Sequence, residues 1–167
     1  MKPVVGIIMG SDSDLLVMQE AANILKQFGI SYEIGVYSAH RSPHRTADYV
    51  KSARERGLKV IIAGAGSSAH LAGVTAAGTT LPVIGVPIDS SPLSGFDSLL
   101  STVQMPPGVP VATMGVGKSG ATNAGIFAVQ ILALEDEDLM RRLVDHKAQL
   151  EKSVAEKSRE IQEQDAG

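Results

Sequence analysis

Five short runs of β-branched and other apolar residues recur along the 167-residue chain, and their spacing constrains the fold more than any other feature. The runs start about 23 to 28 residues apart and cover residues 4–9, 32–37, 60–63, 83–86 and 109–114. Most of them are apolar at every position, which is typical of strands buried on both faces of a parallel sheet. The second run alternates more, so we expect it to lie nearer an edge.

Helical patterns fill the intervals between these predicted strands. Ser11 with Asp14 three residues later predicts a capped helix start. Ser42 and Pro43 predict the N-cap and first position of the next helix, which we expect to end at Gly57. Further helices are predicted near residues 70–79, 95–104 and 120–134. Strands alternating with helices predict an α/β fold, a three-layer α/β/α sandwich with a parallel five-stranded sheet, and we expect the flavodoxin-like strand order.

The C-terminal segment differs from the rest because it is highly charged. Its apolar residues form a narrow stripe: Leu139, Leu143, Leu150, Val154 and Ile161. A single helix of ~27 residues would be about 40 Å long, whereas the preceding ~135 residues should have a radius of gyration of about 14 Å. We therefore expect a flavodoxin-like catalytic domain over residues 1–135 and a C-terminal helix over 136–167 that docks on a neighbouring subunit. A solvated terminal helix is the alternative.

Composition excludes several classes of protein. The chain has 15 Lys and Arg against 18 Asp and Glu, so it lacks the basic excess of a dedicated nucleic-acid binder. No apolar run reaches the ~18 residues that span a bilayer, and the N-terminus lacks the pattern of a signal peptide. Cysteine is absent, which excludes a disulfide framework and a thiolate metal site. We expect a cytoplasmic protein with no nucleic-acid or membrane partner.

Polar loops follow all five predicted strands. They read GSDSD at 10–14, SAHRSP at 38–43, GAGSSAH at 64–70, PIDSS at 87–91 and GVGKSG at 115–120. Ligands of parallel α/β sheets bind outside the carboxyl ends of the strands. Small residues let backbone N–H groups approach a ligand, and each loop opens a helix whose N-terminus favours anions. The sequence therefore predicts an anionic ligand at this edge of the sheet.

The first two loops carry the side chains that best fit a nucleotide. Hydroxyl groups come from Ser11, Ser13 and Ser38. Arg41 adds a guanidinium that can grip a phosphomonoester through two hydrogen bonds. Asp14 can accept hydrogen bonds from a ribose hydroxyl pair, or it is only a first-turn acid of the helix. His40 precedes Arg41 directly, and an imidazole beside a bound phosphate ester is a natural proton shuttle.

Two nucleotide motifs compete with this interpretation. GAGSSA at 64–69 fits the dinucleotide fingerprint, and Asp89 lies where a ribose-binding acid would lie. However, the fingerprint usually follows the first strand, and we expect no second domain that would hold a substrate. Residues 117–119 read GKS, but Ala112 occupies the position where a P-loop requires its first glycine.

The histidines also raise the question of a metal site. His40 and His44 are four residues apart, but Pro43 begins a helix between them, and no acid accompanies them at metal-ligand spacing. We therefore expect no metal. His70 opens the third predicted helix, where it either lines the pocket or serves packing.

The same motifs taken in order resemble the PurE family of purine biosynthesis. The resemblance covers about residues 4–134 and rests on GIIMGSDSD, SAHRSP, VIIAGAG, SSAHLAG, PVIGVP and LSGFDSLLSTVQMPPGVPVATM. SAHR and GAGxxAH are similar to the class I branch, N5-carboxyaminoimidazole ribonucleotide mutase. The class II branch carboxylates aminoimidazole ribonucleotide with free carbon dioxide and typically has Lys after SAH, where this chain has Arg41.

The resemblance implies an isomerase of IMP biosynthesis that converts N5-carboxyaminoimidazole ribonucleotide to 4-carboxy-5-aminoimidazole ribonucleotide. It implies His40 as the catalytic acid and base, with a ribonucleotide as the small-molecule partner. The implied substrate-binding residues are Ser11, Ser13, Asp14, Ser38 and Arg41, and we expect Gly66, Ser67 and His70 of the third loop to join them. It further implies no metal or organic cofactor, and a homo-octamer whose C-terminal helices dock on neighbouring subunits.

The third loop departs from the family pattern. Relatives commonly read GGAAHLPG, whereas this chain has Ser67 and Ser68 before Ala69 and has Ala72 in place of the proline. The remaining alternatives are a carboxylase that uses free carbon dioxide, a dinucleotide-binding oxidoreductase, and a nucleotide-sensing module without catalysis.

Overall fold

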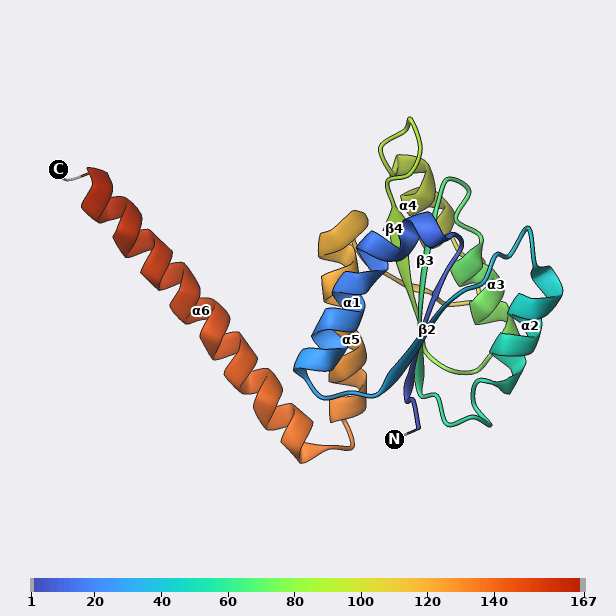
Figure 1. Ribbon diagram of the computed structural model, residues 1–167, viewed down its shortest axis with the longest axis horizontal. Helices are drawn as coiled ribbons and strands as arrows, with labels where there is room; N and C mark the ends of the chain where they lie inside the picture. Colours follow the sequence, from blue (N-terminus) through green and yellow to red (C-terminus); the bar gives the residue numbers. More distant parts are fainter. Residues whose placement is uncertain (1, 166–167) are drawn as a thin grey trace. The chain divides into compact units, whose positions relative to one another are not determined.

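The computed structural model describes residues 2–165, and its first compact unit ends at Val129. This unit is built on one five-stranded sheet in which every pair of neighbours is parallel (Figure 1). The strands are β1 (Val5–Met9), β2 (Tyr32–Val36), β3 (Val60–Gly66), β4 (Val83–Ile88) and β5 (Ala112–Thr113). Their order is β2-β1-β3-β4-β5, which is flavodoxin-like; the fold class is as expected, while the strand order itself cannot be read from the sequence.

Helices cover both faces of this sheet. They are α1 (Leu15–Gln27), α2 (Pro43–Ser52), α3 (Leu71–Gly78), α4 (Phe96–Val103) and α5 (Gly117–Ala133), with a short 3₁₀ turn, η1 (Asp12–Asp14), before α1. α1 and α5 lie together on one face, while α2 and α3 lie on the other (Figure 1). α4 shares the second face, because Thr102 of α4 and Ala72 of α3 both approach Gly85 of β4. The predicted three-layer sandwich is thus confirmed.

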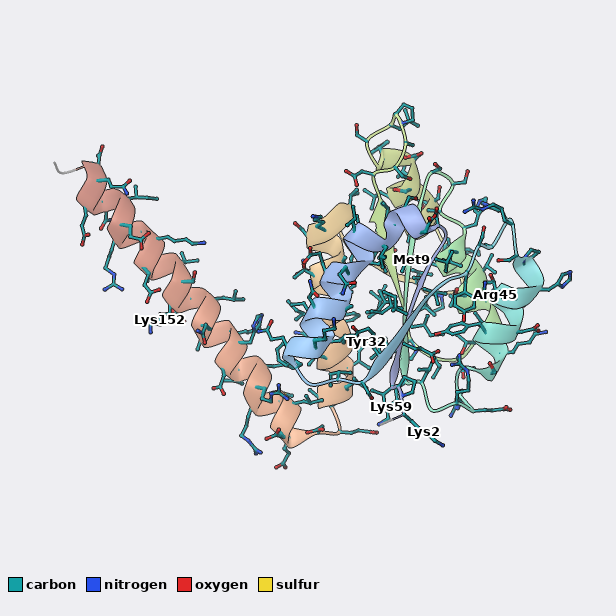
Figure 2. The ribbon with its side chains drawn as sticks, viewed as in Figure 1. Lys2, Met9, Tyr32, Arg45, Lys59 and Lys152 are labelled. Carbon is teal, nitrogen blue, oxygen red and sulfur yellow. The ribbon has the colours of Figure 1, made fainter. Side chains whose placement is uncertain are left out.

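Burial explains which runs became central strands. All five residues of β1, all six of β4 and the first five of β3 are buried. Met9, the last residue of β1, is buried where the strand ends (Figure 2). β2 lies at an edge, as predicted, and exposes part of Ile34 and Val36. The continuous apolar runs are therefore the ones with a neighbouring strand on each side.

The fifth predicted strand is much shorter than expected. The sequence predicted residues 109–114, but only Ala112 and Thr113 pair with β4. Pro110 has no amide hydrogen to donate, and the N–H of Val109 donates to Pro106 in a turn instead. β3 and β4 extend further than predicted, through Gly66 and Ile88.

The second helix also ends earlier than predicted, at Ser52 rather than at Gly57. The N–H of Ala53 donates to Val50, which tightens the end of the helix into a turn. Gly57 has a φ of 101° and so supplies the left-handed residue later, in the turn that leads to β3.

The second compact unit begins at Gln130 and contains α6 (Glu137–Asp165). This helix has 29 residues and is therefore about 43 Å long. The Asp136 carboxylate caps it by accepting the N–H groups of Asp138 and Leu139. Of the predicted stripe, Leu139 and Leu143 are buried, and the three later residues, Leu150, Val154 and Ile161, are exposed.

Across the described residues, 2–165, the structure contains no helix with both the length and the apolar character needed to cross a membrane.

Gly64 of β3 is a point where the sheet and α1 meet most closely. A Cβ built at Gly64 would overlap the Sδ of Met18, which is fully buried on α1. We predict that Gly64→Ala lowers the free energy of unfolding by about 1–3 kcal/mol, because the added methyl group overpacks the core. Chemical denaturation measures this change.

Gly115→Ala is the matched control, since a Cβ there meets no atom within 4 Å and should leave stability nearly unchanged. Met18→Ala removes the side chain that the added methyl group would overlap. In a double-mutant cycle, the Met18→Ala, Gly64→Ala double variant should therefore lose less unfolding free energy than the two single variants lose in sum. If the two substitutions are simply additive, the contact with Met18 is not the cause.

Candidate active site

A cavity of about 400 Å³ opens at the carboxyl end of the sheet. Its lining comes from the loops after β1, β2, β3 and β4. All nine residues proposed from the sequence line it: Ser11, Ser13, Asp14, Ser38, His40, Arg41, Gly66, Ser67 and His70. The structure therefore brings the predicted residues together, and their individual roles stay predictions.

The fifth polar loop, 115–120, lies at the same edge of the parallel sheet as the other four, as expected, but contributes no residue to the lining of this cavity. The strand order explains the difference. From β1 the chain first adds β2 on one side of β1, and then crosses over to add β3 on the other side. The loops that follow β1 and β3 therefore diverge, and a crevice opens between them at the carboxyl end of the sheet. β5 is at the far edge, beyond β4, and its loop begins away from that crevice.

The loop after β1 positions an acid in the cavity. Ser11 and Asp14 form the predicted capping box, in which the N–H of Ser11 donates to Oδ2 of Asp14 at 3.0 Å. The Oγ of Ser11 accepts the N–H of Ser13 at 3.4 Å. Asp14 is only 4% exposed, and burial raises the pKa of its carboxyl against the opposing effects of the Ser11 N–H, the Ser13 side chain and the charge of Arg41. The result is an oriented acceptor whose charge is costly to bury.

Arg41 joins the second loop to the first. Its Nη2 donates to the carbonyl oxygen of Gly10 at 2.8 Å, and its Nε donates to Oγ of Ser38 at 3.4 Å. The backbone N–H of Arg41 also donates to Ser38 Oγ, at 3.1 Å. The guanidinium is thus held at the mouth of the cavity while remaining exposed, as a group that binds an anion must be.

Ser42 braces the same loop instead of capping α2 through its side chain. Its hydroxyl donates to the carbonyl oxygen of Ser38 and accepts the N–H of Ser38. Thr46 donates a second hydrogen bond to that carbonyl, at 3.2 Å. The backbone of Ser38 is therefore held by Ser42 and Thr46, while its hydroxyl accepts hydrogen bonds from Arg41.

Two histidines meet across the cavity. The Nε2 of His40 lies 2.6 Å from Nδ1 of His70, and the ring planes are nearly perpendicular, at 86°. The sequence left open whether His70 lines the pocket or serves packing, and the structure places it in the pocket, exposed.

The loop that carries His70 has an unusual backbone. Ser67 and Ala69 both have positive φ, 52° and 34°, and neither is a glycine. Such a conformation costs an L-residue roughly 1–2 kcal/mol, and it persists where the surroundings enforce it, often at functional sites. The N–H of Ala69 donates to Gly66 and closes the turn.

Ser90 is a lining residue that our list of site residues omitted. It follows β4, and a Cβ at Gly66 would overlap its hydroxyl, so Gly66 is needed for this close approach. The sequence indicated the polar loop 87–91 directly after a buried strand, but it did not indicate which residue of that loop lines the cavity. The other lining residues missed from the sequence are Gly10, Ala39, Ala65, Ala69 and Leu71, which present backbone or small apolar surface.

The GAGSSA motif contributes Ala65, Gly66, Ser67 and Ala69 to the cavity lining, but the other residues that supported the competing readings do not line it. Asp89, Lys118 and His44 are all exposed and none of them lines the cavity. Within residues 2–165, no three His, Asp or Glu side chains are grouped so that they could hold a metal ion.

Comparison with known proteins agrees with the resemblance seen in the sequence. Residues 4–153 match the family model described as AIR carboxylase. A protein from Bacillus subtilis named N5-carboxyaminoimidazole ribonucleotide mutase is 56% identical over 161 residues, which cover 96% of this chain and 99% of that protein. A protein of the same name from Pyrococcus horikoshii is 53% identical over 162 residues, covering 97% of this chain and 90% of the other.

The fold is similar to a solved one as well. The crystal structure of Treponema denticola PurE superposes with a TM-score of 0.83 at 28% identity, covering 92% of this chain and 95% of that one. Sequence and structure thus agree over nearly the whole length, and the chain belongs to the AIR carboxylase family.

Proposed function

We propose that the chain is an N5-carboxyaminoimidazole ribonucleotide mutase, an isomerase of purine (IMP) biosynthesis. Relatives of that name are 53–60% identical over most of the chain, which supports this assignment. The observation that carries it is the position of His40 beside Arg41 in one cavity with Asp14. A group that can grip a phosphate, an acceptor for ribose and a titratable ring are the three elements that this reaction needs.

The cavity suits a ribonucleotide in size and polarity. Its volume of about 400 Å³ lies in the range of small-ligand sites. Arg41 would bind the phosphate with the hydroxyls of Ser13 and Ser38, and Asp14 would accept the ribose hydroxyls. The imidazole base would then extend toward His40 and His70.

The proposed reaction moves a carboxyl group from nitrogen to carbon. The N–C bond of the carbamate breaks, carbon dioxide leaves, and the exocyclic nitrogen takes a proton from His40. The ring carbon then attacks the trapped carbon dioxide, and His40 takes the proton that this carbon releases. Every electron pair stays within the substrate and carbon dioxide, so we propose no redox or organic cofactor and no metal.

Two effects of different size would drive this reaction. General acid–base help contributes about 10²–10⁴-fold. Holding the two fragments in reacting geometry contributes up to about 7–11 kcal/mol, which is more. Loops 64–73 and 87–94 are the proposed walls and lid of the chamber. Containment should therefore matter more than proton transfer.

We also propose that the chain works as a cytoplasmic homo-octamer. His40 and Arg41 are exposed in the single chain, although the reaction needs a closed chamber. Among the exposed apolar side chains are two sets: Leu93, Phe96, Leu100 and Val103 on α4 and the loop before it, and Leu150, Val154 and Ile161 on α6. Docking of the C-terminal helix on a neighbouring subunit would cover the second set.

The name of the family, AIR carboxylase, favours a second candidate, direct carboxylation of aminoimidazole ribonucleotide by free carbon dioxide. Isotope tracing separates the two. We predict that the purified protein converts the carbamate nucleotide without ATP, and that labelled bicarbonate in solution does not enter the product rapidly. Rapid incorporation of the label during turnover would instead support the carboxylase.

His40→Asn should abolish turnover because it removes the imidazole that we propose gives and takes the proton. We predict a loss of at least about 10²-fold in kcat, with nucleotide affinity nearly unchanged because Arg41 and Asp14 remain. Steady-state kinetics and calorimetric titration measure the two effects separately. Near-normal turnover would remove His40 from the proton transfer.

Asp14→Asn should raise the melting temperature at neutral pH and weaken nucleotide binding. Burial raises the pKa of Asp14 in the folded protein above its value in the unfolded chain. The contribution of Asp14 to the free energy of unfolding is therefore fully present only below the unfolded-state pKa, and it is lost as pH rises through the folded-state pKa. The variant, which has no charge to bury, should melt above the wild type at neutral pH, and the difference should shrink as pH falls. Its nucleotide affinity should drop about tenfold or more, since a charged acceptor is lost.

Thermal melts across pH and calorimetric titration test both parts. A lower melting temperature at neutral pH would show that the capping hydrogen bond outweighs the burial of charge. Unchanged affinity would exclude Asp14 from ribose binding.

A further inference from the structure

The contact between His40 and His70 has the geometry of a hydrogen bond. A distance of 2.6 Å between His40 Nε2 and His70 Nδ1 requires one nitrogen to donate and the other to accept. The ring centroids are 4.8 Å apart and the rings meet edge to face, so they do not simply stack. Both side chains are exposed in the cavity, and packing in the core is therefore not what holds them together.

The backbone brings the two rings together from different loops. His40 follows β2, and His70 is the N-cap residue of α3 after β3, with β1 between those strands. His70 directly follows Ala69, whose φ of 34° is unfavourable for an alanine. A strained backbone next to the contact indicates that the position of His70 is enforced by its surroundings.

We propose that His70 is a positioning residue that shares a proton with His40 during the reaction. This inference rests on the proposed function. Because Nε2 of His40 faces His70, Nδ1 is the nitrogen of His40 left to face the substrate. His70 thereby fixes both the orientation of the catalytic ring and the tautomer in which it acts.

The proton balance closes when the pair starts with one positive charge. His40 then carries a proton on Nδ1, and His70 carries protons on Nδ1 and Nε2. When His40 gives its Nδ1 proton to the exocyclic nitrogen, the hydrogen between the rings moves from His70 Nδ1 to His40 Nε2, and both rings become neutral. When His40 takes the proton of the ring carbon, the same hydrogen moves back. An imidazolate never forms.

The charges around the pair favour such sharing. Arg41 and Asp14 are the other ionisable groups that line the cavity, and the N-terminus of α3 adds a partial positive charge at His70. Arg41 and the helix terminus disfavour a full positive charge on one ring, and Asp14 favours it. Dividing the charge between two rings lowers its cost at either one.

His70→Asn tests the proposal in the full-length protein. The asparagine Oδ1 can lie where Nδ1 of His70 lies and accept a hydrogen from His40, but it cannot take the proton. We expect kcat to fall about 10- to 100-fold, which is part of the whole acid–base contribution. KM should stay unchanged, and the pH profile of kcat should lose one ionisation. Unaltered kcat and profile would overturn the proposal, since a static hydrogen bond would then suffice.

His44→Asn is the matched control, because it removes an exposed imidazole on α2 that does not line the cavity. It should leave kcat, KM and the pH profile as they are. His70→Phe keeps a ring but offers no hydrogen bond, and it should lose more kcat than His70→Asn. If His70→Phe instead retains more kcat than His70→Asn, the volume of the ring and not its nitrogen is what matters, and the proposal is overturned.

Nitrogen-15 NMR of the histidine rings in the free wild-type protein gives a readout without turnover. We expect Nε2 of His40 and Nδ1 of His70 to titrate together and to share one hydrogen, and His40→Asn to shift the signal of His70 Nδ1. Independent titration of the two rings would overturn the proposal whether or not the protein has mutase activity. Coupled rings without mutase activity would instead contradict the proposed function.

Discussion

The pairing of β1 with β2 and β3 determines where everything at the site lies. Met9, the last residue of β1, is level with Val36 of β2 and with Gly64 of β3. The N–H of Tyr37 donates to Met9 and the N–H of Gly10 donates to Gly64, so pairing continues to the point where the first loop departs. Three loops therefore leave the sheet within a few residues of the same height, and short side chains are enough to bring their functional groups together.

The loops are held by hydrogen bonds that leave polar groups directed at the cavity. Arg41 connects the second loop to Gly10 of the first, and the His40–His70 contact connects the second loop to the third. The site also stores unfavourable features, a buried carboxyl at Asp14 and left-handed backbone at Ser67 and Ala69. Core residues that fill the sheet offset these costs, which is the usual division between a stable scaffold and a strained site.

Much of this architecture could be predicted because burial on both faces leaves a simple signal. Continuous apolar runs marked β1, β3 and β4, and the more alternating run marked the edge strand β2. The length of β5 was overestimated because the apolar run contains Pro110, whose missing N–H limits pairing with β4. A pattern of apolar residues alone does not show that a backbone donor is missing. The end of α2 was misplaced because Gly57 acts in a later turn.

The sequence allowed the side chains that line the cavity to be named, but not the contacts between their loops, and the roles of these side chains stay predictions. Ser11, Asp14 and Arg41 could be chosen from their chemistry and their place after a strand. The contact of His40 with His70 could not, since it depends on a positive φ at Ala69 that an alanine gives no reason to expect. Ser90 was missed for a related reason: its approach depends on the absence of a side chain at Gly66, a feature of two loops together.

The exposure of the cavity bears on how a reaction that releases carbon dioxide can be contained. Carbon dioxide is small and uncharged, so neither Arg41 nor a helix N-terminus holds it strongly, and only walls keep it beside the ring. Small residues line much of the cavity, and Ser90 belongs to the segment that leads to Leu93 and Phe96, each 63% exposed. A second protein surface that packed on these apolar side chains would remove them from water and cover the open cavity at the same time. The need to trap a neutral fragment and the need to bury these side chains are therefore the two physical arguments for the subunit assembly that we propose.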